Sequence, residues 1–289
     1  MDFKEELENI KVIIDKELKD ILKHKDLHQR KVLDAIEYSL FTGGKRLRPI
    51  LAIKSYEIFG KDTSEIMPFA LGIEMIHTYS LIHDDLPAMD NDSYRRGKLT
   101  NHVVFGDAIA ILAGDGLLNL SYEVMSDFIY ENAKNLNDYE KYNKAIREIG
   151  KYSGIYGMIG GQVVDLTVNL LDITEEKLLF MYRAKTAALI QSALVAGAII
   201  GEAMDEEIEL MRDFGLNLGM AYQIRDDILD IHKDSNAEKV TYLTFFDEIS
   251  AKYAVEEYSN AAMENLNKLS KRDTSFFKNL TKKLMGRNR

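Results

Sequence analysis

Apolar residues recur every three or four positions through most of the 289-residue chain, which is the spacing of one face of an α-helix. Near the N-terminus the pattern runs through Leu7, Ile10, Ile14, Leu18 and Ile21. The same period continues through 28–41, 50–59, 65–83, 107–130, 138–152, 175–200, 206–231 and 250–268. No run of alternating apolar and polar residues is bounded by turn residues, so we assign no strands.

No linker rich in proline, glycine or serine divides the chain. The polar stretch 132–144 is interpreted as a surface turn between helices. Segment 187–201 is apolar nearly all round, so we expect it to lie in a central core. The pattern therefore predicts one all-α domain over residues 1–289.

Composition narrows the class of protein. The chain carries 47 acidic and 37 basic side chains, and this acidic balance argues against a nucleic-acid-binding protein, which would show a basic face. The absence of cysteine excludes disulfides, thiolate metal ligands and thiol nucleophiles. The N-terminal residues do not resemble a secretory signal, and the longest apolar stretch is shorter than a bilayer span. We therefore expect a cytoplasmic protein without stable membrane insertion.

A dense group of carboxylates follows the apolar segment 65–83. It contains Asp84, Asp85, Asp90 and Asp92. Like charges repel, and no cationic residue lies between these four, so we expect a neutralising cation from outside the chain. Pro87 interrupts the helical hydrogen bonds, and a bulge there is needed to bring Asp90 back toward Asp84.

A second acidic group lies far downstream. Asp226 and Asp230 are four residues apart on one predicted helical face, with Asp227 beside them. Isolated Asp-Asp pairs usually lie on solvated surface, but both pairs here occur in apolar helices with a further aspartate nearby. Aspartates without cysteine suit hard cations such as Mg²⁺, which is often shared between carboxylates and substrate phosphates.

Basic residues near these groups predict anion binding. The stretch "GGKRLRP" (43–49) places Lys45 and Arg48 next to flexible glycines, and Arg95 and Arg96 follow the first acidic group. His77, on an apolar face, is by default a satisfied core histidine. By default the isolated basic residues Lys185 and Lys239 are solvated. Two acidic groups and a separate basic site together predict two diphosphate substrates, one bridged through Mg²⁺ and one held by lysine and arginine.

In these motifs the chain resembles the trans-isoprenyl diphosphate synthases, or polyprenyl synthetases, over residues 28–245. The matching strings, in order, are "GGKRLRP", "HTYSLIHDDLPAMDNDSYRRGKLTNH", "FGDAIAILAGDGLL", "GGQVVDL", "KTAALI" and "QIRDDILD". The extra Pro87–Ala88 pair gives the first aspartate motif the form typical of bacterial short-chain farnesyl or geranyl diphosphate synthases. The resemblance implies a homodimer, each chain a bundle of roughly ten or more helices around a central active-site cavity.

The resemblance also implies roles for single residues. The implied metal ligands, for roughly three Mg²⁺ ions with substrate bound, are Asp84, Asp85, Asp90 and Asp226, with Asp227 and Asp230 in support. The residues implied to contact the allylic diphosphate are Arg95, Lys185 and Lys239, flanked by Thr186 and Gln223. The residues implied to hold isopentenyl diphosphate are Lys45, Arg48, His77 and Arg96. The predicted catalytic residues among these are Asp84, Asp85, Asp90, Arg95, Lys185, Asp226 and Asp227.

The implied reaction is a head-to-tail (1′–4) condensation of isopentenyl diphosphate with dimethylallyl or geranyl diphosphate. Mg²⁺ assists ionisation to an allylic carbocation, which the double bond of isopentenyl diphosphate attacks. Tyr79 and Ser80 precede Asp84 on the same predicted helix, and an aromatic ring at Tyr79 would form the floor of the cavity. We therefore predict farnesyl diphosphate as the product, with geranyl or geranylgeranyl diphosphate as alternatives.

The sequence departs from the family after "DDILD", where a Gly-Lys loop is missing and Lys233 is the candidate replacement for its lysine. This loss leaves open a non-catalytic or regulatory subunit of a heteromeric synthase, although such subunits usually lose one aspartate motif. A terpene cyclase is a second alternative, but "DDILD" and "GGKRLRP" do not fit its motifs. An HD-type metal phosphohydrolase ranks last, because His77 and His83 are six residues apart and poorly matched on a helix.

Overall fold

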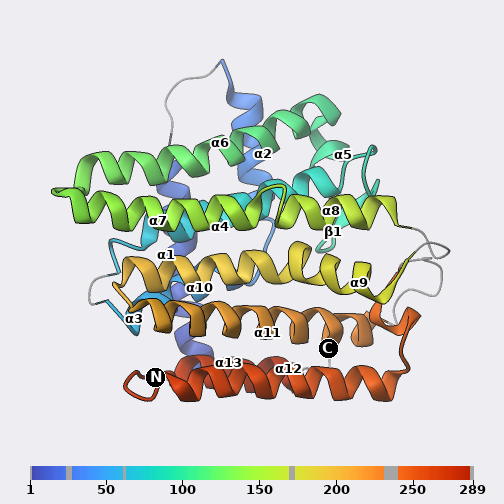
Figure 1. The fold of residues 1–289 in the computed structure, drawn as a ribbon. Helices are drawn as coiled ribbons and strands as arrows, with labels where there is room; N and C mark the ends of the chain where they lie inside the picture. The colour runs from blue at the N-terminus through green and yellow to red at the C-terminus, as the bar shows by residue number, and fades with distance from the viewer. Residues whose placement is uncertain (1, 24–27, 61–62, 169–172, 231–239, 287–289) are drawn as a thin grey trace. The chain divides into compact units, whose positions relative to one another are not determined.

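A computed structural model of the chain describes residues 2–23, 28–60, 63–168, 173–230 and 240–286, which are almost entirely helical (Figure 1). The elements in chain order are α1 (Phe3–Ile21), α2 (Arg30–Phe41), α3 (Leu47–Glu57), α4 (Met67–Asp84), β1 (Tyr94–Arg95), β2 (Lys98–Leu99), α5 (Asn101–Phe105), α6 (Asp107–Asn132), α7 (Leu136–Ser153), α8 (Met158–Thr167), α9 (Glu175–Met181), the π-helix η1 (Tyr182–Ala187), α10 (Ala188–Ile200), α11 (Asp205–Asp230), the 3₁₀ helix η2 (Tyr242–Thr244), α12 (Glu248–Lys268) and α13 (Ser275–Met285). The predicted all-α fold is confirmed.

The chain forms two compact units. The first contains Met1–Ile53 and Ser64–Glu140, and the second contains Lys54–Thr63 and Lys141–Arg289. Each unit is described by itself below. The predicted single domain over residues 1–289 stays a prediction.

In the first unit, α4 packs against α6, and α2 packs against α5 and α6. Phe69 of α4 meets Phe128 of α6 edge-on, with ring centroids 5.9 Å apart. Gly72 lets the two helices approach closely, because a Cβ there would lie 3.1 Å from the Met125 sulfur. These contacts anchor the N-terminal half of α4, the helix whose other end carries Asp84, in a packed core.

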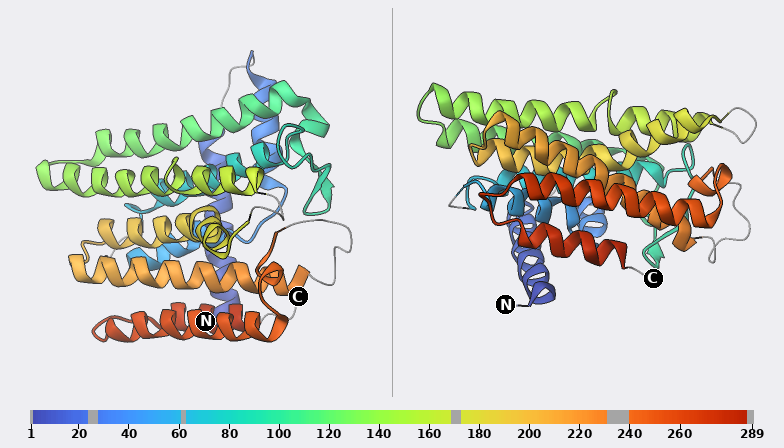
Figure 2. Two further views of the ribbon diagram at one scale, coloured as in Figure 1. Left: turned by 45° about the vertical axis from the view of Figure 1, so that its right-hand side comes forward. Right: turned by 60° about the horizontal axis from the view of Figure 1, so that its bottom comes forward.

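In the second unit, α11 packs against both α10 and α12, and the three helices run side by side (Figures 1 and 2). Every residue of α10, Ala188–Ile200, is buried, as the apolar stretch predicted. Gly219 of α11 allows close contact, because a Cβ there would lie 2.5 Å from the Ala187 Cα. The middle of α11 is thereby fixed, and its far end carries the second aspartate group.

Several short elements differ from the sequence predictions. The assignment of no strands is wrong, because β1 and β2 pair antiparallel with Tyr94 opposite Leu99. Two-residue strands are too short to show alternation, and the turn requires positive φ at Arg96 (53°) and Gly97 (76°). The interpretation of 132–144 as a turn is also wrong beyond its first residues, since α7 begins at Leu136. Helices α5, α8 and α13 and the π-helix within 175–200 had no separate prediction.

Two helical segments are long and apolar enough for a membrane span by length and composition alone, Asp107–Asn132 and Glu175–Ile200. In the second segment 78% of the apolar window is buried inside the structure, as in the core helix of a soluble protein. In the first, only 33% of the window is buried. One face of α6 therefore exposes apolar side chains, among them Ile111 and Leu112.

Candidate active site

The first aspartate group lies in a tight turn at the C-terminal end of α4. The helix ends at Asp84, and the Asp90 backbone N–H donates to the Asp84 carbonyl oxygen over 2.9 Å. Asn91, with φ of 54°, donates from its backbone N–H to the carbonyl oxygen of Leu86. The predicted bulge after Pro87 is confirmed, and it brings Asp84 and Asp90 together despite their separation of six residues.

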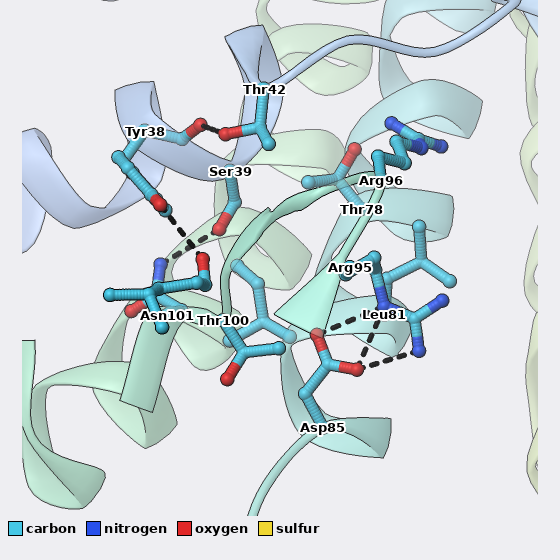
Figure 3. A pocket seen from close by; sticks show the side chains of 12 residues that line it. Tyr38, Ser39, Thr42, Thr78, Leu81, Asp85, Arg95, Arg96, Thr100 and Asn101 are labelled. Atoms are coloured by element: carbon cyan, nitrogen blue, oxygen red, sulfur yellow. Dashed lines mark hydrogen bonds and ion pairs between the residues drawn. The ribbon is translucent and has the colours of Figure 1, made fainter. Parts of the chain in front are cut away.

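Asp85, by contrast, is buried and bound to Arg95. The Arg95 Nε donates to Asp85 Oδ1 over 2.8 Å, and Arg95 Nη2 lies 2.6 Å from the same oxygen (Figure 3). Burial raises the pKa of the Asp85 carboxyl group in spite of this partner. In this structure Asp85 orients Arg95, while its predicted role as a metal ligand stays a prediction.

The hairpin that carries Arg95 also delivers Arg96 to the glycine-rich loop of residues 43–46. The Arg96 Nη1 donates to the Gly43 carbonyl oxygen. A Cβ on Gly44 would lie 2.7 Å from the same Nη1, and Gly43 and Gly44 have φ of 111° and 133°. Only glycine suits this backbone and this close approach.

A cationic cluster forms next to this loop. Arg48, in the first turn of α3, has its Nη1 3.3 Å from Nε2 of His77 on α4. Burial, and then Arg48, Arg96, Arg95 and Arg46, hold the pKa of His77 well below its usual range. The first unit thus brings Arg48 and Arg96 close to His77, and Lys45, the fourth residue implied for isopentenyl diphosphate, lies in the adjoining loop.

A pocket lies between α2, the C-terminal half of α4 and the β1–β2 hairpin (Figure 3). Its lining includes the polar or charged residues Tyr38, Thr78, Asp85, Arg95 and Arg96. The Tyr38 hydroxyl donates to the Leu99 carbonyl oxygen over 2.7 Å, which fixes the end of the hairpin on α2. The hairpin that carries Arg95 and Arg96 is therefore fixed to α2.

In the second unit, the aspartate group lies at the C-terminal end of α11. Asp227 is only 7% exposed and accepts hydrogen bonds from the backbone N–H of Tyr242 (2.8 Å), from Gln223 Nε2 (3.0 Å) and from the Tyr182 hydroxyl. Burial raises the pKa of its carboxyl group. Asp227 therefore ties η1 and η2 to α11, whereas Asp226 is half-buried and Asp230 is exposed.

In the second unit, the predicted site residues Lys185 and Thr186 lie on the π-helix η1. Lys185 Nζ forms an ion pair with Asp165 of α8, and Thr186 Oγ1 donates to Gln223 Oε1 over 2.7 Å. Gly161 of α8 makes room for this turn, because a Cβ there would lie 2.4 Å from the Lys185 backbone nitrogen. The unit therefore groups Lys185, Thr186, Gln223 and Asp227, while Lys239 lies outside the described residues.

No set of three or more metal-ligating side chains stands preformed within the ranges that the structure describes. The residue types nevertheless fit Mg²⁺, because the turn closed by the backbone hydrogen bond between Asp90 and Asp84 carries two carboxylates, the oxygen ligands that Mg²⁺ prefers. Mg²⁺ usually takes one or two carboxylates and completes its shell with water and substrate phosphate. The aspartates are therefore suited to a metal that arrives with its substrate.

Sequence reasoning missed several residues of this site. Tyr182 and Asp165 hold predicted site residues, yet neither stood out, because a tyrosine or an aspartate near a helix is common. Glu74 carried a usable signal, since a lone glutamate inside the apolar segment 65–83 requires a cationic partner. That partner is Arg46, with 2.8 Å between Arg46 Nη1 and Glu74 Oε1.

Comparison with known proteins agrees with this geometry. The profile of the family described as polyprenyl synthetase matches residues 29–244. The farnesyl diphosphate synthase of Bacillus subtilis is 39% identical over 244 residues, which cover 81% of this chain and 81% of that protein. The heterodimeric geranylgeranyl pyrophosphate synthase large subunit 1, chloroplastic, of Arabidopsis thaliana is 43% identical over 226 residues, which cover 73% of this chain and 60% of that protein.

The fold has a match among solved structures as well. The crystal structure of an FPP/GFPP synthase from Zymomonas mobilis superimposes with a TM-score of 0.87 and 30% sequence identity. The match covers 98% of this chain and 99% of that one.

Proposed function

This chain belongs to the polyprenyl synthetase family, and from this premise we propose that it is a prenyltransferase that condenses isopentenyl diphosphate head-to-tail (1′–4) with dimethylallyl or geranyl diphosphate. The reaction breaks the bond between C1 of the allylic substrate and its diphosphate. It joins this C1 to C4 of isopentenyl diphosphate, which leaves a cation at C3. C2 of isopentenyl diphosphate then loses a proton to the departing diphosphate, and a double bond forms between C2 and C3.

The cationic cluster around His77 carries this proposal. Arg46 and Arg95 are paired with carboxylates, through Glu74 and Asp85. Arg96 instead donates to a carbonyl oxygen, and partial removal from water together with Arg46 and Arg95 lowers its pKa. Since a carbonyl oxygen carries no formal charge, the Arg96 guanidinium keeps a positive charge that favours a bound anion such as a diphosphate.

The residues of the first unit have distinct tasks in the proposed reaction. Lys45, Arg48 and Arg96 would bind the diphosphate of isopentenyl diphosphate. His77 stays uncharged and offers one ring nitrogen for a hydrogen bond. Asp85 fixes the guanidinium of Arg95 for the allylic diphosphate.

Each unit carries proposed ligands for Mg²⁺, Asp84 and Asp90 in the first unit and Asp226 in the second. Bound Mg²⁺ would withdraw charge from the leaving diphosphate of the allylic substrate. Lys185 would contribute a further cation, oriented by its ion pair with Asp165. Asp227 would keep this region in place through its three hydrogen bonds.

We propose farnesyl diphosphate as the product because of Tyr79. This side chain is 6% exposed on α4, and its ring packs edge-on against His83 with centroids 5.8 Å apart. His83 in turn fills the space beside Gly114 of α6, where a Cβ would lie 2.1 Å from the His83 Nε2. Tyr79 and His83, with Ser80 beside them, would block the growing product chain at α4.

We further propose that the chain works as a cytoplasmic homodimer. The observation that favours self-association is the exposed apolar surface of α5 and α6, which includes Val103, Val104, Ile111 and Leu112. A second copy of the same face would cover it by two-fold symmetry.

An assay of the purified chain alone tests the proposed activity. We expect a farnesyl product from isopentenyl and dimethylallyl diphosphates with Mg²⁺, and no product once EDTA removes the metal. Arg96→Gln should raise the KM for isopentenyl diphosphate at least about tenfold, because a charge-assisted contact is lost. Arg30→Gln, which removes only a surface pair with Asp34, is the control. A chain that makes product only with a second subunit would refute the proposal.

A further inference from the structure

Arg46 has an unusual backbone for a residue other than glycine. Its φ is 50°, in the left-handed region that is unfavourable for a residue other than glycine. It ends the loop that begins with Gly43 and Gly44, and its carbonyl oxygen accepts the backbone N–H of Ile50 over 3.1 Å in the first turn of α3. The conformation of Arg46 therefore sets the direction in which α3 starts.

The side chain of Arg46 holds this backbone in place. It is 4% exposed, and it donates from Nε to Asp15 Oδ1 over 2.7 Å, from Nη1 to Glu74 Oε1 over 2.8 Å, and from Nη2 to the Leu40 carbonyl oxygen. These partners lie on α1, α4 and α2, so one guanidinium joins three helices of the first unit. A buried arginine with two carboxylates has its own charge compensated and is not free to bind substrate.

The neighbours of Arg46 on the chain are the residues that need a fixed position. Lys45 directly precedes it and is exposed, and Arg48 follows two residues later, with its Nη1 3.3 Å from His77 Nε2. A rotation of the backbone at Arg46 would move both cations relative to His77. Such a movement would weaken the binding of a diphosphate that contacts Lys45 and Arg48 together.

We propose that Arg46 is a positioning residue for the isopentenyl diphosphate site, and that Asp15 makes helix α1 part of this support. The inference rests on the proposed function. It extends that function to α1, which precedes the residues 29–244 matched by the family profile. No contact between Arg46 or Asp15 and the substrate is involved.

The test uses Asp15→Asn, Arg46→Lys and the control Asp20→Asn. Asp15 is half-buried, so its amide variant should fold, whereas Asp20 lies on the same helix in an exposed pair with Lys23. Asp15→Asn removes one charge-assisted bond, and we expect the KM for isopentenyl diphosphate to rise about fivefold to tenfold. The KM for the allylic substrate, kcat and the midpoint of thermal unfolding should match those of Asp20→Asn.

A binding measurement separates this inference from the activity. Inorganic pyrophosphate is titrated calorimetrically into the full chain in EDTA, so that only cationic side chains bind it. Asp15→Asn and Arg46→Lys should each weaken pyrophosphate binding by the same factor by which they raise the KM for isopentenyl diphosphate. Arg46→Lys keeps the charge, but a lysine cannot bind all three partners of the guanidinium. Unchanged affinity for pyrophosphate in this variant would therefore contradict the proposed role of the Arg46 guanidinium.

Other outcomes overturn the proposal. One is pyrophosphate affinity in Asp15→Asn equal to that of Asp20→Asn. Another is a loss that affects both substrates equally and accompanies a lower unfolding midpoint, which would mark a structural role only. If the wild-type chain makes no product, the proposed function fails, yet the pyrophosphate titration still decides whether Arg46 positions the site.

Discussion

Acidification should destabilise the protein through His77. Burial and the surrounding arginines keep its folded-state pKa well below the value of about 6.5 for an exposed histidine. Below about pH 6.5 the unfolded chain takes up a proton at this residue and the folded chain does not, so the free energy of unfolding falls as pH falls. If the folded form stays unprotonated, this loss amounts to about 1.4 kcal/mol between about pH 7.5 and about pH 5.5.

The assay is urea unfolding of wild type and His77→Gln at both pH values, followed by circular dichroism. Other groups with shifted pKa values, such as the carboxyls of Asp85 and Asp227, are present in both proteins. The difference between the two pH dependences therefore isolates His77. Equal pH dependence in the two proteins would refute the assignment of an uncharged histidine in a cationic cluster.

Bound anion should change this behaviour in a defined direction. Pyrophosphate next to the arginines would offset their field and raise the pKa of His77 toward its ordinary value. Saturating pyrophosphate should then shrink the difference between wild type and His77→Gln at the lower pH. An unchanged difference would indicate that the anion binds away from this cluster.

Two further predictions concern product length and the π-helix η1. Tyr79→Ala should lengthen the product beyond farnesyl diphosphate, with Tyr130→Ala, a change at an exposed tyrosine of α6, as the control, and chromatography of the products checks this. Unchanged length would show that the cavity floor lies elsewhere. Gly161→Ala places a Cβ 2.4 Å from the Lys185 backbone nitrogen. We therefore expect the KM for the allylic substrate to rise at least about tenfold. The control is Gly286→Ala, where the nearest atom to the added Cβ is 3.4 Å away. Equal kinetics in both variants would argue against a role for the π-helix.

The long helices and the grouping of the cations follow from short-range patterns, which is why the sequence predicts them. A helical period needs only a few turns of chain, and Pro87 marks the bulge between Asp84 and Asp90 by local chemistry alone. The glycines before Lys45 likewise mark a loop that a bulky residue would not adopt. Each of these features depends on residues that are close together in the sequence.

The support of the site depends on contacts between distant residues, which local patterns do not encode. Tyr182 reaches Asp227 across 45 positions, and Asp15 reaches Arg46 across 31. Asp15 is one of several acids on an amphipathic helix, and nothing local distinguishes it from its exposed neighbours. The π-turn is equally hidden, because one extra residue in a turn barely disturbs the apolar period of 175–200.

The small hairpin from Tyr94 to Leu99 carries both Arg95 and Arg96, the two arginines proposed to bind different diphosphates. Arg95 faces the acidic turn through Asp85, and Arg96 faces the glycine loop through the Gly43 carbonyl oxygen. Since both arginines are held by a single tight turn, a side chain introduced at Gly97, with φ of 76°, would strain the backbone that positions both guanidinium groups. Substitutions meant to change the affinity for one substrate alone should therefore be made on the helices that face this hairpin and not at Gly97.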